Sequence, residues 1–252
     1  MSCNVLFSNK MIGKNLIVEK NDKGWYKVKL GELNNFNSKD EYYLEEGFKE
    51  LLSEQNSYLS VKNRLESGLL KGECTHPIRE GHSDADWLTR NMIIHDAFAS
   101  HQFMEIMMQT TNNVSLGRNI IEIWAWILPC ENDCGKSLKA DLDNPDVNVA
   151  FSIRCFSKVV NHMGRVGKII TKIVCWDRID IPGLKNAVKG GNIDAITREA
   201  GLTDVIISGS TLDVILNTKN FFTNENAGLR SEIMDIKNTI ENNSDKKLFF
   251  KW

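Results

Sequence analysis

The sequence predicts an α+β fold with a mainly antiparallel sheet. Strand-like segments stand on both sides of a central segment with helical spacing, rather than alternating regularly with helices. Residues 147–156 alternate apolar and polar side chains, which is typical of a strand with two different faces. The polar link at 19–24 ends in Gly24, a pattern that indicates a hairpin.

Length and composition indicate a globular protein. The chain has 252 residues, of which 42% are hydrophobic and 25% charged, so wholesale disorder, collagen-like repeats and a bare coiled coil are excluded. A chain of this length can bury a core without disulfides or metals. Its 31 Lys and Arg against 33 Asp and Glu give a net charge of -2, so we expect no nucleic-acid partner.

The six cysteines are scattered, and the first twenty residues lack the continuous apolar run of a signal peptide. We therefore expect reduced thiols in a cytoplasmic setting. The most apolar stretch, 91–108, is interrupted by His95, Asp96, His101 and Glu105. It is not expected to span a membrane.

The N-terminal half begins with two strand-like runs, followed by segments with apolar residues at helical spacing. Ser38 and Ser83 are placed to cap the first and third helical segments, and Asp84 and Asp86 lie where carboxylates favour a helix N-terminus. The strand-like runs are 14–18 and 25–30, and the helical segments are 40–52, 58–70 and 84–108.

In the C-terminal half, predicted strands are followed by short segments with helical spacing. The predicted strands are 119–129, 147–156 and 164–177, with one or two helical turns at 137–143. Beyond Gly190-Gly191 only short helical segments follow, at 195–200, 212–216 and 229–240. We therefore divide the chain into a main domain, 1–185, and a C-terminal extension, 186–252.

Three residues are candidates for nucleophilic catalysis. Ser152 lies in the middle of a predicted strand, a rigid mount for a hydroxyl that a neighbouring base could activate. His76 precedes Pro77, which stiffens the backbone that would aim the imidazole. Asp177 ends a strand and could orient that imidazole. The competing interpretations are a solvated strand serine, a loop histidine and a carboxylate in a turn.

Metal sites are the alternative. The dipeptide His95-Asp96, with His76, His82 and His101 nearby, is typical of HD-type metal-dependent phosphohydrolases. On a straight helix, however, His95 and His101 would point about 240° apart, so they could not share one ion. Cys130-x-x-x-Cys134 supplies half of a zinc site, but no second closely spaced pair follows.

The order of these features resembles one protein family. Gly72-Glu73-x-x-His76-Pro77-x-Arg79 is similar to the histidine motif of the prohead core proteases of tailed bacteriophages, and Phe151-Ser152-Ile153-Arg154 is similar to their serine motif. Trp176-Asp177-x-x-x-x-Pro182 resembles the strand end that follows. The resemblance covers about 14–185.

This resemblance implies a barrel-like core flanked by helices, similar to the herpesvirus assemblins. It also implies a serine endopeptidase of capsid maturation that needs no metal or cofactor. Ser152 would be the nucleophile, His76 the general base, Asp177 the third triad member and Arg154 an oxyanion-placing or orienting residue. Glu73, Asp84 and Asp86 remain alternatives to Asp177.

The same resemblance implies partners and a location. The substrates would be scaffold or core proteins and the major capsid protein, cut after glutamate inside the immature capsid in the host cytoplasm. No nucleic acid or membrane is involved, and a homo-oligomer remains open. The extension could restrain the enzyme and be removed by autoprocessing at Glu199-Ala200. A capsid scaffold protein without turnover is the non-enzymatic alternative.

The sequence departs from the family pattern at two places. Cys155, Phe156 and Ser157 follow Arg154 where relatives often have a small residue and glycines, which leaves the shape of the oxyanion site open. The segment 81–117 is longer than expected and would form a lid, a substrate wall or an oligomer contact.

Overall fold

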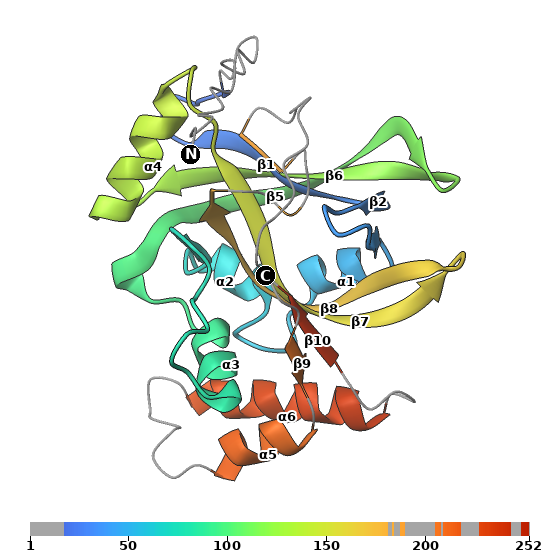
Figure 1. The fold of residues 1–252 in the computed structure, drawn as a ribbon. Helices are drawn as coiled ribbons and strands as arrows, with labels where there is room; N and C mark the ends of the chain where they lie inside the picture. Colours follow the sequence, from blue (N-terminus) through green and yellow to red (C-terminus); the bar gives the residue numbers. More distant parts are fainter. Residues whose placement is uncertain are drawn as a thin grey trace, which may run out of the picture.

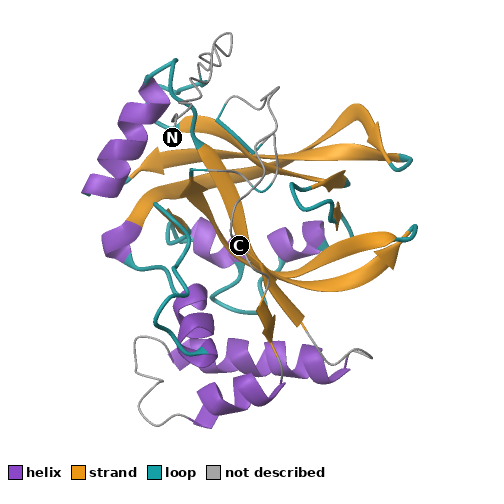
Figure 2. Ribbon diagram, in the orientation of Figure 1, coloured by secondary structure: helices purple, strands orange, loops and turns teal. Residues whose placement is uncertain are grey.

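In the computed structural model, two sheets pack face to face and helices cover their ends (Figures 1 and 2). The structure describes residues 18–180, 183, 187–189, 205–207, 209–217, 227–242 and 248–251. The predicted segments 14–17 and 195–200 lie outside this part of the chain.

The first sheet is antiparallel throughout, in the order β1-β6-β5-β4. Its long members form one hairpin, in which Leu116 and Gly117 make the turn with φ of 46° and 77°. Positive φ at both central residues is the backbone of a hairpin turn that matches strand twist. The strands are β1 (Tyr26–Leu33), β4 (Lys71–Glu73), β5 (Ala99–Ser115) and β6 (Arg118–Pro129).

The second sheet has the order β2-β3-β8-β7-β10-β9, and only its β3–β8 pair is parallel. Its centre is the long hairpin β7–β8, whose tip projects from the body beside that of β5–β6 (Figure 1). The strands are β2 (Asn35–Phe36), β3 (Tyr42–Leu44), β7 (Ala150–His162), β8 (Arg165–Ile179), β9 (Val205–Ile207) and β10 (Leu248–Lys251).

The main core fills the space between the two sheets. Val28 and Ile127 of the first sheet and Phe151 and Trp176 of the second are all 0% exposed. Trp176 packs its ring against that of Phe103, with centroids 5.9 Å apart. Burial of large apolar side chains from both sheets therefore sets how closely the sheets approach.

Helices surround this core. A second apolar cluster joins α3, α5 and α6 to the second sheet. Its members include Trp87, Phe156, Leu212 and Ile233. In Figure 1, α5 and α6 lie together at the bottom of the molecule, next to α3. The helices are α1 (Phe48–Ser53), α2 (Val61–Glu66), α3 (Asp84–Met92), the 3-10 turn η1 (Asp96–Phe98), α4 (Asp133–Asp143), α5 (Gly209–Asn217) and α6 (Ala227–Asn242).

The α+β class and the mostly antiparallel pairing are confirmed, but the barrel-like core is wrong. Within the described residues, the two sheets remain separate and do not close into a barrel. Strand β1 is one edge of the first sheet, and β2 is one edge of the second.

The central helix predicted over 84–108 is also wrong in its second half. Ser83 does cap α3, accepting from the backbone N–H of Asp86, but the helix ends at Met92 and Ile93 is extended. From Ala99 onward the chain is β5, paired along its length with the apolar strand β6. Pairing with a long neighbouring strand overrode the helical spacing of the apolar residues.

The helix predicted over 40–52 splits for a similar reason. Tyr42–Leu44 forms β3, which pairs with β8, and α1 begins only at Phe48, after Gly47 with φ of 75°. Ser38 is therefore no helix cap here. The strands predicted over 119–129, 147–156 and 164–177 are confirmed as β6, β7 and β8, although β7 begins at Ala150 and β8 at Arg165.

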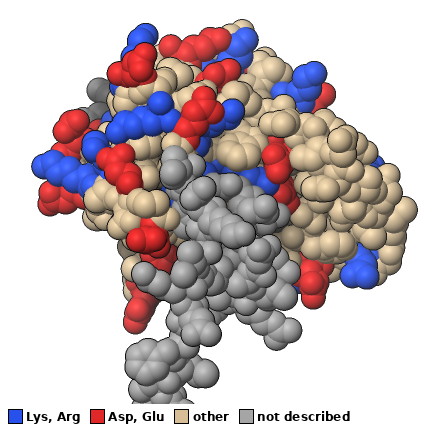
Figure 3. Space-filling model, turned by 90° about the horizontal axis from the view of Figure 1, so that it is seen from above, with Lys and Arg blue, Asp and Glu red and all other residues tan. Residues whose placement is uncertain are grey.

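Two surface observations bear on partners. In the described part of the chain, no helix is long and apolar enough to cross a membrane. On the face shown in Figure 3, basic and acidic side chains are interspersed rather than gathered by sign, which agrees with the net charge of -2.

Candidate active site

The pairing of β7 with β8 sets Ser152 directly opposite Asp177. Residues opposite each other in an antiparallel pair share a face, with Cβ atoms about 4.5–5.5 Å apart. Arg154, two residues after Ser152, points to that same face and contacts Asp177. Strand register alone therefore gathers three of the four predicted site residues.

The fourth residue arrives from the first sheet because Gly72 of β4 lies against β8. A Cβ on Gly72 would lie 2.0 Å from the carbonyl oxygen of Trp176, a distance that no side chain permits. At this approach the backbone N–H of Glu73 donates to Oδ1 of Asp177 at 2.8 Å. The glycine in the histidine motif is thus what lets the two sheets meet at the site.

His76 completes the group. Its Nδ1 lies 2.7 Å from Oδ2 of Asp177, and the two side chains are 7% and 0% exposed. Pro77, which follows, is also buried and holds the turn. An imidazole whose Nδ1 is held by a carboxylate presents Nε2 as the atom that can exchange a proton.

Arg154 binds Asp177 from the other side. Its Nε donates to Oδ2 and its Nη2 to Oδ1, both at 2.8 Å, so the two groups form a bidentate pair that is fully buried. Its Nη1 donates to the carbonyl oxygens of Asn91, in the last turn of α3, and of Ile93, which caps that helix. All of these N–H groups of Arg154 donate to oxygen atoms of the protein itself. The guanidinium therefore holds the Asp177 carboxylate in one orientation.

Glu73 and Arg90 extend this network. Arg90 donates to both carboxylate oxygens of Glu73, at 3.0 and 2.7 Å, and Arg154 Nη2 lies 3.0 Å from Glu73 Oε2. The backbone N–H of His95 also donates to Glu73, at 2.7 Å. Two guanidinium groups and two carboxylates thus balance each other's charge inside the protein.

This environment determines the charge of Asp177. Burial alone would raise the pKa of its carboxyl, but the charge of Arg154, the contact with His76 and the N–H of Glu73 together hold that pKa well below its usual range. For Arg154, burial lowers the pKa, and the charges of Asp177 and Glu73 outweigh this effect and raise the pKa. Both groups are therefore ionised at neutral pH.

Ser152 is 7% exposed, and within the described part of the chain its hydroxyl makes no hydrogen bond. Ser152 and His76 are both neighbours of Asp177, but the two are not hydrogen-bonded to each other here. Catalytic hydrogen bonds are often long without substrate and shorten in the complex. Asp177 therefore contacts the His76 ring and stands opposite Ser152 in the sheet, while the hydroxyl and the imidazole remain apart.

The other carboxylates considered for the third position have different partners. Glu73 binds Arg90 and Arg154. Asp84 pairs with Arg79 at 2.6 Å, and Asp86 accepts from the hydroxyl of Ser83. Of these four carboxylates, the one in contact with the His76 ring is Asp177.

A pocket of about 480 Å³ opens beside His76. Arg90 and His82 supply basic groups to its wall, and Ile78 and Phe98 supply apolar ones. The lining residues are Glu73, Thr75, His76, Pro77, Ile78, Glu80, His82, Arg90 and Phe98.

The remaining histidines do not form a metal centre. His101 is fully buried, where burial lowers its pKa to about 4, and it packs edge-on against Phe103 and Phe151 as a core residue. His95 stacks against Phe98. Among the described residues, no group of three His, Cys, Asp or Glu could hold a metal ion. The arrangement does not support the HD-type phosphohydrolase.

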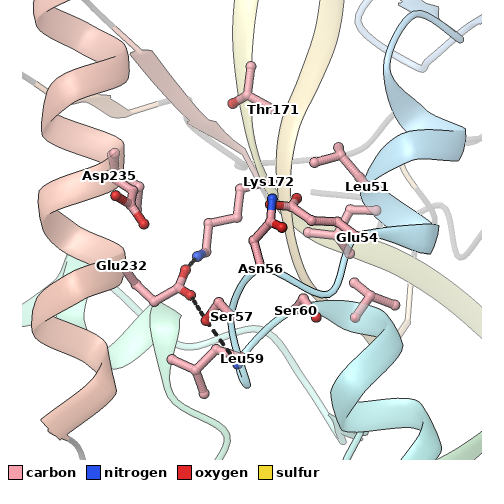
Figure 4. Close-up of a pocket in the computed structure, with 13 residues that line it drawn as sticks. Leu51, Glu54, Asn56, Ser57, Leu59, Ser60, Thr171, Lys172, Glu232 and Asp235 are labelled. Carbon is pink, nitrogen blue, oxygen red and sulfur yellow. Dashed lines mark hydrogen bonds and ion pairs between the residues drawn. The ribbon is translucent and has the colours of Figure 1, made fainter.

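A second cavity, of about 470 Å³, shares no lining residue with the first and lies between α6 and the segment that joins α1 to α2 (Figure 4). There Lys172 forms an ion pair with Glu232, which also accepts from the hydroxyl of Ser57. These contacts join α6 to β8 and to the segment between α1 and α2, and they hold α6 against the sheet.

Sequence reasoning missed Gly72, Arg90 and the carbonyl of Trp176 as parts of the site. Gly72 lies within the histidine motif, so the motif marked its position but not its steric role. Nothing in the sequence marked Arg90 as a site residue, because its position on α3 is that of an ordinary surface arginine. Its partner Glu73 lies in a different element, which only the fold brings near.

Two sequence comparisons found no match: one with curated proteins and one with solved structures. The sequence model of the Peptidase S80 family matches residues 2–235. The match covers nearly the whole chain and includes Ser152, His76, Asp177 and Arg154.

We predict that Gly72→Ala destabilises the protein by about 1–3 kcal/mol, because the new methyl group must push β4 away from the Trp176 carbonyl. Urea unfolding measures this change. Gly209→Ala is the control, since a Cβ on Gly209 meets nothing within 4 Å. Equal midpoints for the two variants would contradict the steric role of Gly72.

We predict that Asp177 makes the free energy of unfolding depend on pH in the acidic range. Because its pKa in the folded state lies below the unfolded value of about 3.9, its contribution is complete above that pH and is lost progressively as the pH falls. In Asp177→Asn, stability should therefore fall less steeply below about pH 4. Unfolding free energies measured from pH 2 to 7 test this, with Asp180→Asn as the surface control. An unchanged slope would be the contrary result.

Proposed function

Because this chain belongs to the Peptidase S80 family, a family of phage prohead and capsid maturation serine proteases, we propose that Ser152, His76 and Asp177 are its catalytic triad. The observation that carries the proposal is the position of Asp177. It contacts the His76 ring at 2.7 Å and stands opposite Ser152 in the sheet.

The proposed reaction proceeds by acyl transfer. His76 takes the proton of the Ser152 hydroxyl as its oxygen attacks the scissile carbonyl, and then gives that proton to the leaving amine. Water, activated by the same imidazole, hydrolyses the acyl-enzyme. Backbone N–H groups near Arg154 would stabilise the tetrahedral oxyanion. The mechanism requires no metal or cofactor.

Asp177 holds the imidazole and stabilises it while it is positively charged. The buried, ionised state of Asp177 suits this role, and Arg154 keeps the carboxylate in one orientation. The contacts of Arg154 therefore favour an orienting role over direct contact with the oxyanion.

The substrates that we propose are phage scaffold or core proteins and the major capsid protein, cut inside the immature capsid. Cleavage after glutamate is part of the proposal. The pocket beside His76 could receive the substrate side chain, and the guanidinium of Arg90 in its wall could attract a glutamate, while Glu73 and Glu80 line the same wall. Because Arg90 already donates to both carboxylate oxygens of Glu73, its attraction for a substrate glutamate is weakened.

We predict that Ser152→Ala and His76→Ala each lower peptide hydrolysis by about a thousandfold or more, because the two groups act as a unit. His162→Ala is the matched control, since His162 lies at the end of β7 near the hairpin tip, stacks on Tyr42 and does not line the pocket. The measurements are cleavage of the scaffold protein and labelling by a fluorophosphonate in the presence of a chelator.

Labelling that maps to Ser152 and persists with the chelator supports the protease. Folded wild-type protein that neither reacts with the probe nor cleaves capsid or scaffold substrates, alone or in assembled particles, would instead support the non-enzymatic scaffold role. Undiminished cleavage by Ser152→Ala would refute the assignment of the nucleophile.

We also propose that residues 186–252 regulate the protease. Two segments of the extension border β7 around Ser152: the N–H of Phe151 donates to the carbonyl of Ala187, and β10 pairs with β7 at Cys155–Ser157. A polypeptide on this edge lies close to the proposed nucleophile. The suggested cleavage point, Glu199-Ala200, lies outside the described residues.

If the extension is removed by autoprocessing, the active wild-type protein should lose its C-terminal mass, whereas Ser152→Ala should keep it. Intact-mass measurement of both proteins after incubation checks this expectation. A wild-type chain that is fully active and retains residues 186–252 would show that trimming is no part of activation.

A further inference from the structure

Two cysteine sulfurs touch next to the candidate base. Sγ of Cys134 lies 2.8 Å from Sγ of Cys74, and both thiols are free. The two residues are 60 positions apart in the chain, so the fold brings them together. Cys74 stands between Glu73 and the turn that carries His76, whereas Cys134 belongs to the first turn of α4.

Both sulfurs stand on segments that are held in place. The N–H of Cys74 donates to the carbonyl of Phe98 at 2.9 Å. Asn132 caps α4 by accepting from the N–H of Gly135, and its amide donates to the carbonyl oxygens of Asp96 and Ala99. The contact between the sulfurs therefore joins two ordered elements.

Gly135 fixes the position of Cys134 further. A Cβ on Gly135 would lie 1.9 Å from the carbonyl oxygen of Cys130, so the first turn of α4 packs directly on that backbone. A disulfide has an S–S distance of about 2.05 Å, so the Cys74 and Cys134 sulfurs need to move less than about 1 Å to bond.

We propose that Cys74 and Cys134 are a redox-modification site, at which hydrogen peroxide joins them in a disulfide that ties the His76 segment to α4. One sulfur attacks the peroxide oxygen and becomes a sulfenic acid, releasing the first water. The other sulfur then attacks that sulfur and releases the second water. The two S–H bonds break, one S–S bond forms, and the two electrons lost by sulfur reduce the peroxide.

The chemistry of the pair favours a disulfide over a metal. The pair supplies two sulfur ligands, and within the described residues no third ligand completes a set that could hold an ion. Burial and the neighbouring Cys134 raise the pKa of the Cys74 thiol to about 11. Its thiolate is therefore scarce at neutral pH, and the disulfide should form faster as the pH rises.

The disulfide would close a long loop of chain and link two parts of the main domain. Loop closure restricts the unfolded chain, so oxidation should raise the Tm of the full-length protein by about 5 °C. A thiol reductant should reverse the rise. Neither readout requires peptidase activity, so this site and the proposed triad can fail independently.

The test treats the full-length protein with hydrogen peroxide at pH 7 and pH 9, followed by peptide mapping without reduction and thermal unfolding. We expect one linked peptide pair, Cys74 with Cys134, that forms faster at pH 9, together with the reversible rise in Tm. Cys130→Ser is the matched control, because it removes a half-buried thiol close to α4 and should keep both effects.

Cys134→Ser should lose both effects, and Cys74→Ser provides the same test from the other side. Should either variant fail to fold, the other still decides. Peptide maps in which Cys74 and Cys134 remain separate, or in which Cys134 links to Cys130, would overturn the proposal. So would a rise in Tm that survives in Cys134→Ser.

Discussion

The site depends on one buried carboxylate, that of Asp177. Its two oxygens accept from Arg154, and the same oxygens meet His76 and the backbone N–H of Glu73. Removing a charge from water costs several kcal/mol unless partners of opposite charge and good geometry replace the water. Arg154 supplies that replacement, which is why an ionised aspartate can stand fully buried beside a histidine.

Asp177 also joins the two sheets. It belongs to β8 of the second sheet, whereas Glu73 and His76 come from β4 of the first sheet and the turn after it. Gly72 allows β4 to approach β8 closely. The ion pair of Glu73 and Arg90 lies next to this point of contact. The nucleophile that we propose and its base thus come from different sheets, so the catalytic geometry depends on correct packing between them.

A buried ion network of this kind adds little to stability when it is complete, and it costs much when one partner is lost. Replacing paired buried charges by apolar groups of similar shape is often neutral for stability, whereas breaking one pair is costly. The Glu73, Arg90, Arg154 and Asp177 network therefore makes one arrangement of the two sheets much better than its alternatives. Of its four members, Glu73 belongs to the histidine motif and Arg154 to the serine motif, whereas Arg90 comes from α3 and Asp177 from β8.

Much of the sheet could be predicted, because β6, β7 and β8 carry their own apolar alternation and β-branched residues. The helical reading of 99–108 failed, since apolar residues there fit two periods and only the partner strand β6 decides between them. Arg154 was found from its motif, but its role was left open between orienting and oxyanion placement. That choice depends on contacts with Asn91 and Ile93, which lie far away in the chain.

The amino-acid sequence by itself determined the α+β class, the strands of the serine hairpin and the short motifs that contain the candidate site residues. Those properties are local, since side-chain period and residue type act over a few neighbours. The tertiary structure decided which carboxylate meets His76, why Gly72 is glycine and that Cys74 touches Cys134. Each of these depends on distances between residues far apart in the chain, and such distances exist only after the sheets have packed.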